Sequence, residues 1–140
     1  MTSAMKTILV VDDDPDIILQ LTAILQQEGY AVHYAATAGE AEEVLLSIRP
    51  DLAIIDLMME ERDSGFVLGH QIKRLYPGTP VMMLTAVKAV TGLSFATGSG
   101  EEQSWLEADL LVDKPIRPEQ LRGDVRRLLS RTSTADRAQQ

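Results

Sequence analysis

The sequence predicts a doubly wound α/β fold, in which one five-stranded parallel sheet is covered by helices on both faces. Short apolar runs alternate along the chain with longer stretches of helical apolar spacing, and this alternation favours β-α-β units with right-handed crossovers. The runs are continuously apolar, which is typical of strands buried on both faces. With 140 residues, of which 45% are hydrophobic, the chain is long enough for one domain with a buried core.

Five apolar runs are predicted as strands, because each is bounded by turn or charged residues and most are rich in aliphatic side chains. The second run, Ala31–Tyr34, carries the weakest signal. The other four are Thr7–Val11, Leu52–Ile55, Val81–Leu84 and Leu110–Val112.

The stretches that follow these runs carry apolar stripes with the spacing of an amphipathic helix. Such a stripe is the face that a helix lays against a sheet, so these stretches are predicted to cover the sheet. The stripes are Ile17-Leu21-Ile24-Leu25, Ala41-Val44-Leu45-Ile48, Leu68-Ile72-Leu75 and Leu121-Val125-Leu128-Leu129.

Capping residues mark several helix boundaries. Asp14 before Pro15 predicts an N-cap followed by proline in the first turn. Gly29 predicts the stop of that first helix. Thr37 with Glu40 forms a capping box for the second helix. A similar pair, Ser99 with Glu102, is predicted to start a later helix.

Two segments carry no strand or helix pattern. Residues 92–100 hold three glycines among Ser and Thr, and they are predicted as a mobile loop. Residues 131–140 are polar and lack an apolar stripe, and they are predicted as a flexible C-terminal tail. The domain is therefore expected to span residues 1–130.

The net charge of −8, from 13 basic and 21 acidic residues, argues against nucleic acid as a ligand of this chain, because a phosphate backbone needs a basic surface. The charge is uneven, since residues 117–140 carry +3 and the rest carries −11. The chain has no cysteine, which excludes disulfides and a cysteine nucleophile. The apolar runs are too short for a signal peptide or a membrane span, so a cytoplasmic protein without a membrane partner is expected.

Polar side chains follow the predicted strands at the points where the strands end. Three aspartates, Asp12–Asp14, follow the first strand, and Asp56 follows the third. Thr85 follows the fourth strand, and Asp113 and Lys114 follow the fifth. In an open parallel sheet the ligand site lies beyond the carboxyl ends of the strands, so these groups are expected to converge there.

Each of these residues has a structural explanation when it is taken alone. Asp14 and Asp16 suit helix capping, Thr85 suits a strand-end hydroxyl, and Lys114 suits a solvated lysine. Together they predict a chemical site. Converging carboxylates repel one another unless a cation lies between them, and ligation by oxygen alone suits Mg²⁺. A central carboxylate can then attack phosphorus, while an ammonium and a hydroxyl stabilise the phosphoryl oxygens.

Four segments, in this order and spacing, resemble the receiver domain of two-component response regulators. The similarity covers about residues 5–130, and it implies a flavodoxin-like sheet with strand order 2-1-3-4-5. The segments are Ile8–Ile17 (ILVVDDDPDI), Ala53–Met59 (AIIDLMM), Met83–Ala86 (MLTA) and Asp113–Leu121 (DKPIRPEQL).

The resemblance implies a metal site made of oxygen ligands. Asp13 would bind Mg²⁺ directly, and Asp12 would assist through water. Asp56 and the backbone carbonyl of Met58 would complete the protein ligands.

The resemblance also implies that Asp56 is the phosphoacceptor, which takes its phosphoryl group from the phosphohistidine of a sensor histidine kinase. Thr85 would move to the phosphoryl group, and Lys114 would pair with that group. The peptide bond between Lys114 and Pro115 is expected to be cis. The chain would phosphorylate itself and lose the group slowly, since the apolar Met58 cannot hold an attacking water, but it would turn over no external substrate.

The output that the resemblance implies is a switched surface formed by the chain after Thr85 and by the last strand and helix. It would act on a downstream effector, or on an output domain missing from this chain. The last helix, with Arg122, Arg126 and Arg127 beside its apolar stripe, is a possible homodimer contact; a plain solvated face is the alternative.

Three features depart from the usual receiver pattern. Met59 is followed by residues 60–65 without a proline and with one extra residue. Leu111 replaces the aromatic switch residue that receivers carry three positions before the lysine. The stretch from Thr85 to Lys114 is longer than usual, and its helix is expected over 100–107 with Trp105 as a packing anchor.

Two other functions are compatible with an α/β fold. A phosphohydrolase with an aspartyl-phosphate intermediate would place a second aspartate two residues after the nucleophile, where Met58 stands. A flavin- or nucleotide-binding module would need backbone donors for phosphate after the first strand, where three aspartates stand instead.

Overall fold

The computed structural model describes residues 5–56, 64–85, 109–114 and 116–138. Five parallel strands form one sheet in the order β2-β1-β3-β4-β5, which confirms the predicted fold class. The strands are β1 (Thr7–Val11), β2 (Ala31–Ala35), β3 (Leu52–Asp56), β4 (Val81–Thr85) and β5 (Leu110–Asp113), and the described helices are α1 (Pro15–Gln27), α2 (Ala38–Ser47), α3 (Ser64–Leu75) and α6 (Pro118–Ala138).

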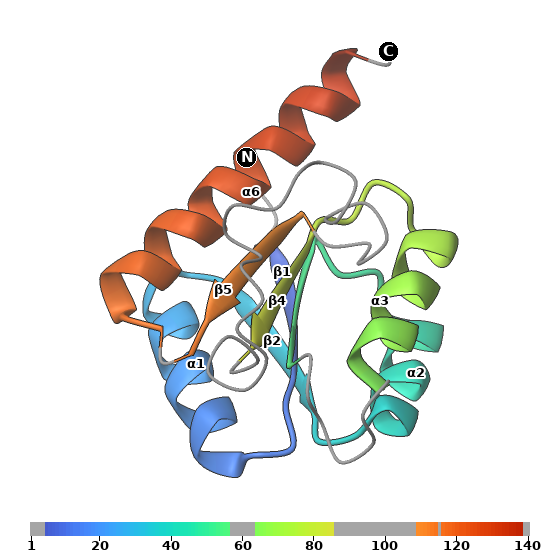
Figure 1. Cartoon of the computed structure of the whole chain (residues 1–140). Helices are drawn as coiled ribbons and strands as arrows, with labels where there is room; N and C mark the ends of the chain where they lie inside the picture. The colour runs from blue at the N-terminus through green and yellow to red at the C-terminus, as the bar shows by residue number, and fades with distance from the viewer. Residues whose placement is uncertain (1–4, 57–63, 86–108, 115, 139–140) are drawn as a thin grey trace.

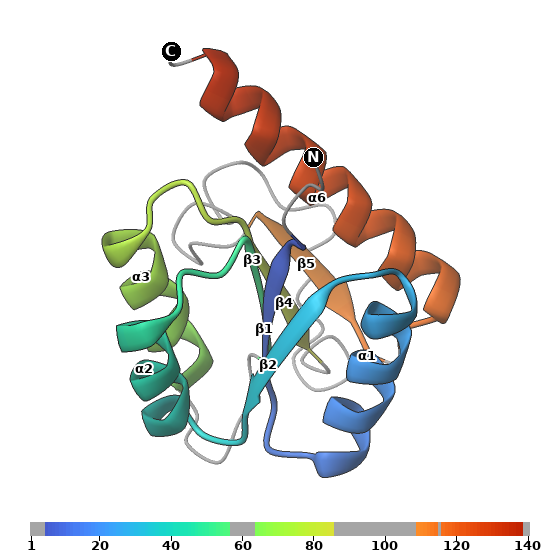
Figure 2. The same ribbon diagram turned by 180° about the vertical axis from the view of Figure 1, so that it is seen from behind.

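The helices lie in two layers, with α1 and α6 on one face of the sheet and α2 and α3 on the other (Figures 1 and 2). This division explains why the strands are apolar throughout, since alternate side chains of each strand enter opposite layers. In β1, for example, Leu9 and Val11 join the cluster under α2 and α3, whereas Ile8 and Val10 join the cluster under α1 and α6. The sheet therefore sits between two separate cores.

The residues of the predicted helical stripes are buried or half-buried, with one exception. Leu21 and Leu25 of α1 pack into the same cluster as the α6 residues Leu121 and Val125. Leu75, at the end of the predicted α3 stripe, is 55% exposed. The stripe of α3 therefore ends one turn earlier than its spacing predicts.

Four strands run one residue further than the sequence predicts. The added residues are the first polar or small residues after each apolar run, namely Ala35, Asp56, Thr85 and Asp113. Parallel pairing carries the sheet up to these residues, with Asp56 opposite Leu84 and Thr85 opposite Asp113. As a result Asp56 and Thr85 are held inside the sheet and are buried.

The predicted caps of α1 and α2 are present. The Asp14 side chain accepts a hydrogen bond from the Asp16 N–H at 2.9 Å, and Gly29 ends α1 with φ +91°, the left-handed region that glycine adopts without strain. Thr37 Oγ1 accepts from the Glu40 N–H at 3.0 Å. The return bond of this capping box differs from the expected one, because the Glu40 carboxylate accepts from the N–H of Ala36.

The C-terminal segment differs from its prediction. Helix α6 continues to Ala138, although residues 131–140 are predicted as a tail, and its end extends beyond the rest of the domain (Figures 1 and 2). No glycine or proline follows Gly123 in this helix, so nothing in its backbone breaks the hydrogen-bond ladder. An apolar stripe is thus not required for the helix to continue.

Three predictions lie on residues outside the described ranges. They are the loop over 92–100, the capping pair Ser99–Glu102 and the helix over 100–107 with Trp105. No described helix is long and apolar enough to cross a membrane.

Candidate functional site

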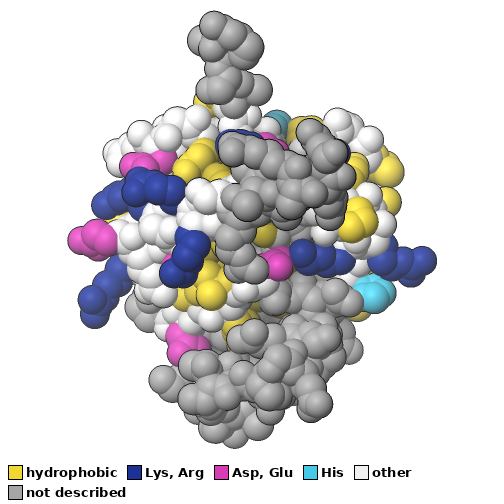
Figure 3. Space-filling model, turned by 90° about the horizontal axis from the view of Figure 1, so that it is seen from above, with side chains coloured by type: hydrophobic (Ala, Val, Ile, Leu, Met, Phe, Trp, Pro, Cys, Tyr) yellow, Lys and Arg dark blue, Asp and Glu magenta, His cyan; other side chains and the backbone are white. Residues whose placement is uncertain are grey.

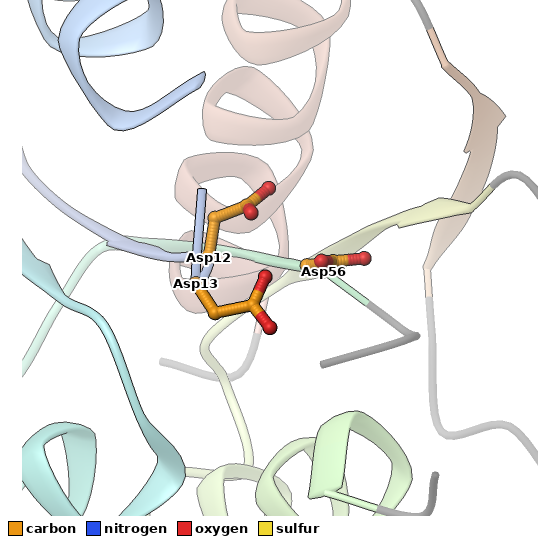
Figure 4. Close-up of side chains that lie close together, drawn as sticks. All are labelled: Asp12, Asp13 and Asp56. Carbon is orange, nitrogen blue, oxygen red and sulfur yellow. The ribbon is translucent and has the colours of Figure 1, made fainter. Parts of the chain in front are cut away.

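Three carboxylates meet at the carboxyl end of the sheet, as the sequence predicts. Asp12 and Asp13 follow β1, and Asp56 is the last residue of β3. One carboxylate oxygen from each lies within 4.8 Å of the other two, and Figure 4 shows the three side chains gathered at this edge. Asp12 is 1% exposed and Asp56 3%, whereas Asp13 is open to solvent.

Asp12 is held in place by its neighbours in the chain and in the sheet. Its N–H donates to the Ala35 carbonyl at the end of β2 at 3.1 Å, and its Oδ1 accepts from the Asp14 N–H at 2.9 Å. The other oxygen, Asp12 Oδ2, is buried and accepts no hydrogen bond within the described part of the chain. A buried carboxylate oxygen in this state is costly unless a cation compensates it.

The side chain of Lys114 enters this cluster from β5. Its Nζ lies 3.2 Å from Asp12 Oδ2 and 3.4 Å from Asp56 Oδ2. The first contact is an ion pair without hydrogen-bond geometry. Burial lowers the pKa of Lys114, but the charges of Asp56 and Asp12 outweigh it and raise that pKa above its usual range. The ammonium is therefore charged at neutral pH.

Thr85 lies at the same end of the sheet, as the fully buried last residue of β4. Its carbonyl accepts the N–H of Lys114 at 2.9 Å, so the end of β4 and the start of the lysine segment are joined. The structure thus brings Thr85 to the edge where the three aspartates and Lys114 meet. Two predicted features, the Met58 carbonyl ligand and the Lys114–Pro115 bond, lie outside the described residues.

The donor set fits a small divalent cation. The described ligands are carboxylate oxygens only, which is the preference of Mg²⁺ rather than of softer metals. Among the described residues, three carboxylates beside one ammonium leave an excess of negative charge, and Asp12 Oδ2 is buried without a hydrogen-bond donor. The arrangement can therefore hold a cation beside a buried carboxylate that is able to act as a nucleophile.

Two features of the site could not be read from the sequence. The end of β2 carries no reactive side chain, yet its Ala35 carbonyl fixes the backbone of Asp12. Any residue type offers such a carbonyl, so the sequence gives no signal for it. The pairing of Lys114 with Asp12 also had no signal, because it depends on the side-chain conformation at the end of a strand.

A groove of about 550 Å³ opens beside the carboxylates, between α1 and the β2–α2 connection. Asp13 lines both the groove and the carboxylate cluster. The exposed side chains of Leu19 and Tyr34 add apolar surface to it. The remaining lining residues are Pro15, Ile18, Thr22, Ala36 and Glu40.

Comparison with known proteins gives a consistent family. Residues 8–126 match the model of the response regulator receiver domain. The DNA-binding response regulator MtrA of Mycolicibacterium smegmatis is 33% identical over 131 residues, which are 94% of this chain and 54% of that protein. The transcriptional regulatory protein GlrR of Escherichia coli is 40% identical over 93 residues, which are 66% of this chain and 21% of that protein.

Solved structures agree with this result. A CheY-like receiver domain protein of Methanospirillum hungatei superposes with a TM-score of 0.78 at 29% identity, covering 94% of this chain and 99% of that one. The chemotaxis response regulator CheY4 of Vibrio cholerae gives 0.73 at 28% identity, covering 89% and 99%. The chain spans about half the length of relatives such as MtrA. It belongs to the family of response regulator receiver domains of two-component signalling.

Proposed function

We propose that this receiver takes a phosphoryl group onto Asp56 from the phosphohistidine of a sensor histidine kinase. The observation that carries the proposal is the position of Asp56. This carboxylate is buried at the end of β3, with Asp12 and Asp13 beside it and the Lys114 ammonium 3.4 Å away. Buried carboxylates with a cationic neighbour at the ligand edge of a parallel sheet are suited to covalent phosphoryl chemistry.

In the proposed step a carboxylate oxygen of Asp56 forms a bond to phosphorus while the bond from phosphorus to the donor nitrogen breaks. The donor histidine leaves as neutral imidazole after it takes up a proton, and Asp56 becomes an acyl phosphate. The Lys114 ammonium and the Thr85 hydroxyl are placed at the same edge to stabilise the phosphoryl oxygens. Positioning and charge stabilisation are the main means by which proteins catalyse such transfers.

The proposed cofactor is Mg²⁺, held by Asp12, Asp13 and Asp56 together with the backbone carbonyl of Met58. When bound, it would supply positive charge to the phosphoryl oxygens and offset the repulsion among the carboxylates. The buried Asp12 Oδ2, which accepts no hydrogen bond in the described part of the chain, supports this assignment.

The groove beside Asp13 supports a docking place for the phosphodonor. Its lining is partly apolar, with Leu19 at 70% exposure, and it reaches the carboxylate cluster through Asp13. A helix of the donor that rests here would bring its phosphohistidine to the edge of the site. The histidine kinase itself is identified only by this chemistry.

Phosphorylation would shift an equilibrium between two conformations. Thr85 and Lys114, joined by a backbone hydrogen bond, lie at the two ends of the chain segment that would respond. Leu111 packs against the core cluster under α2 and α3 and has no aromatic ring to rotate, so the usual threonine–aromatic couple cannot operate. A downstream effector or an output domain would read the altered surface.

The remaining parts of the proposal concern the chain as a whole. The receiver would span residues 1–130, act in the cytoplasm and turn over no external substrate. A homodimer through α6 stays a prediction. Two of the arginines on which it rests pair within the chain, Arg126 with Glu28 at 3.1 Å and Arg127 with Asp124 at 2.6 Å.

The decisive experiment is phosphorylation by acetyl phosphate with Mg²⁺, measured as the mass of the intact protein. Wild type should gain one phosphoryl group, and Asp56→Asn should gain none because its amide is not a nucleophile. Asp113→Asn, at the exposed end of β5 on the same edge, is the matched control and should label like wild type. Full labelling of Asp56→Asn would show that the acceptor is another residue.

A further inference from the structure

The Lys114 side chain occupies the position of a counter-ion among the proposed metal ligands. Its Nζ lies 3.2 Å from Asp12 and 3.4 Å from Asp56, which are two of the three carboxylates in the cluster. At these separations two unit charges of opposite sign attract strongly in a partly buried site. The lysine therefore offsets part of the repulsion that a divalent cation would otherwise relieve.

The same contacts make the lysine a competitor of a divalent cation. A cation held by the three carboxylates would lie near an ammonium that is only 3.2 Å from Asp12 Oδ2 and 3.4 Å from Asp56 Oδ2. Like charges at such distances repel. The ammonium must then withdraw from Asp12, the residue whose Oδ2 accepts no hydrogen bond in the described part of the chain.

The backbone keeps this competitor close to the site. The Lys114 N–H donates to the Thr85 carbonyl at 2.9 Å, directly after the pairing of Asp113 with Thr85. The side chain is only 23% exposed. The backbone of Lys114 is therefore held in place, so withdrawal of the ammonium takes place by rotation of the side chain.

From these observations we infer that Lys114 lowers the affinity of the site for Mg²⁺, so that metal binding and release of the lysine from Asp12 are a single event. This inference rests on the proposed function and deepens it. The released ammonium is the group that the proposed function assigns to the phosphoryl oxygens. The lysine is thus a competitor of the metal before it is a partner of the phosphoryl group.

The test is calorimetric titration of the whole chain with Mg²⁺ in the absence of any phosphodonor. Lys114→Met, which keeps the length of the side chain but removes its charge, should bind Mg²⁺ at least tenfold more tightly than wild type, or about 1.4 kcal/mol. Lys114→Arg keeps the charge and should stay within about threefold of wild type. If Lys114→Met does not fold without metal, Lys114→Gln repeats the titration.

A matched control removes a similar lysine at the other end of the sheet. Lys73 is 21% exposed and pairs with Asp109 at 2.7 Å, so Lys73→Met loses a comparable ion pair. Its Mg²⁺ affinity should equal that of wild type. Thermal melting gives a second readout, because Mg²⁺ should raise the melting temperature of Lys114→Met by more than that of wild type at the same concentration.

The opposite result has a clear meaning. If Lys114 mainly holds the carboxylates in place for the metal, Lys114→Met binds Mg²⁺ equally or more weakly, and the inference is wrong while the proposed phosphoacceptor stands. If wild type and both variants bind no Mg²⁺, the inference and the metal part of the proposed function fail together. Labelling by acetyl phosphate then tests separately whether Asp56 is the phosphoacceptor.

Discussion

The two ends of the sheet each carry a half-buried lysine paired with aspartate, but only one pair is complete. At the amino end, Lys73 Nζ lies 2.7 Å from Asp109 Oδ2 and donates to the Thr79 carbonyl at 3.0 Å. Asp109 Oδ2 also accepts from the Val81 N–H at 2.8 Å. Figure 3, which views this end, shows acidic and basic side chains side by side on its surface.

At the carboxyl end, within the described ranges, one lysine faces more than one carboxylate. Lys114 contacts Asp12 and Asp56 at 3.2 and 3.4 Å, with Asp13 as the third acid of the cluster. One charge is matched by one charge at the amino end, whereas the carboxyl end keeps an excess of negative charge. The Lys73 pair is thus satisfied by groups of the described chain, whereas the excess charge at the carboxyl end fits a site that the proposed cation would complete.

The largest expected effect on stability comes from breaking the Lys73–Asp109 ion pair at the amino end of the sheet. Asp109→Ala removes the acceptor of both Lys73 and the Val81 N–H. The free energy of unfolding should fall by about 2 kcal/mol, since hydrogen bonds to charged groups contribute about 1.5–3 kcal/mol and this pair is partly exposed. Urea unfolding should give the same loss with and without Mg²⁺. A loss that Mg²⁺ reverses would mean that the two ends are not independent.

Neutralising an aspartate at the carboxyl end of the sheet should change the free energy of unfolding in the opposite direction. Asp12→Asn keeps the acceptor for the Asp14 N–H but removes one of three repelling charges. Without Mg²⁺ the free energy of unfolding should rise by about 1 kcal/mol, because the loss of the Lys114 pair is smaller than the relief of burial and repulsion. Added Mg²⁺ should stabilise this variant less than wild type. Destabilisation in metal-free buffer would show that the Lys114 pair dominates.

Alkaline pH should separate the two lysines. The pKa of Lys114 is raised in the folded state, so its contribution to stability is complete below the unfolded pKa of about 10.4 and is lost as pH rises through the higher folded value. Wild type should therefore lose more stability than Lys114→Met above about pH 10, by less than about 1 kcal/mol in this partly exposed site.

Tyr30 must be controlled in that experiment. Burial and the charge of Glu28 raise the pKa of Tyr30, and the charge of Arg126 lowers it by less. The contribution of Tyr30 to stability is therefore also lost as the pH rises, over the same range. The measurement is urea unfolding between pH 8 and 11 in a Tyr30→Phe background. Equal losses in the two proteins would remove Lys114 as the cause.

The smallest effect on stability is expected from an ion pair that lies at neither end of the sheet. Arg126 is 68% exposed where it contacts Glu28 between α6 and α1. Arg126→Ala should change the free energy of unfolding by less than about 0.5 kcal/mol, because solvent screens exposed ion pairs. Chemical denaturation at low and high salt checks this expectation, and a change above about 1 kcal/mol would place the pair among the structural contacts.

The fold could be predicted because its main signals are repeated along the chain. The apolar runs of β1 and β3 place alternate residues, such as Ile54 and Ile55, in opposite cores, and this double burial is what a continuous run indicates. The last residue of a strand was missed because Asp56 is polar. Its place in the sheet depends on pairing with β4, which no local pattern reveals.

The candidate site was predictable in part for a related reason. Strand exits identified Asp12, Asp13, Asp56 and Lys114, because the carboxyl ends of parallel strands share one edge. Distances among those side chains depend on rotamers and on the charge balance of the assembled site. The sequence does not predict the continuation of α6 to Ala138, because residues 131–138 carry no apolar stripe.

The origins of the three carboxylates also have a consequence for the order of folding. Asp12 and Asp13 come with β1, but Asp56 reaches them only after β1 and β3 have paired, around the crossover that contains β2. Parallel pairing of this kind is slow and non-local, so we expect the repelling charges to stay apart and hydrated until late in folding. We expect Asp12→Asn to change the unfolding rate and leave the folding rate nearly unchanged in stopped-flow experiments. The carboxylate cluster would then destabilise the folded domain without slowing its folding.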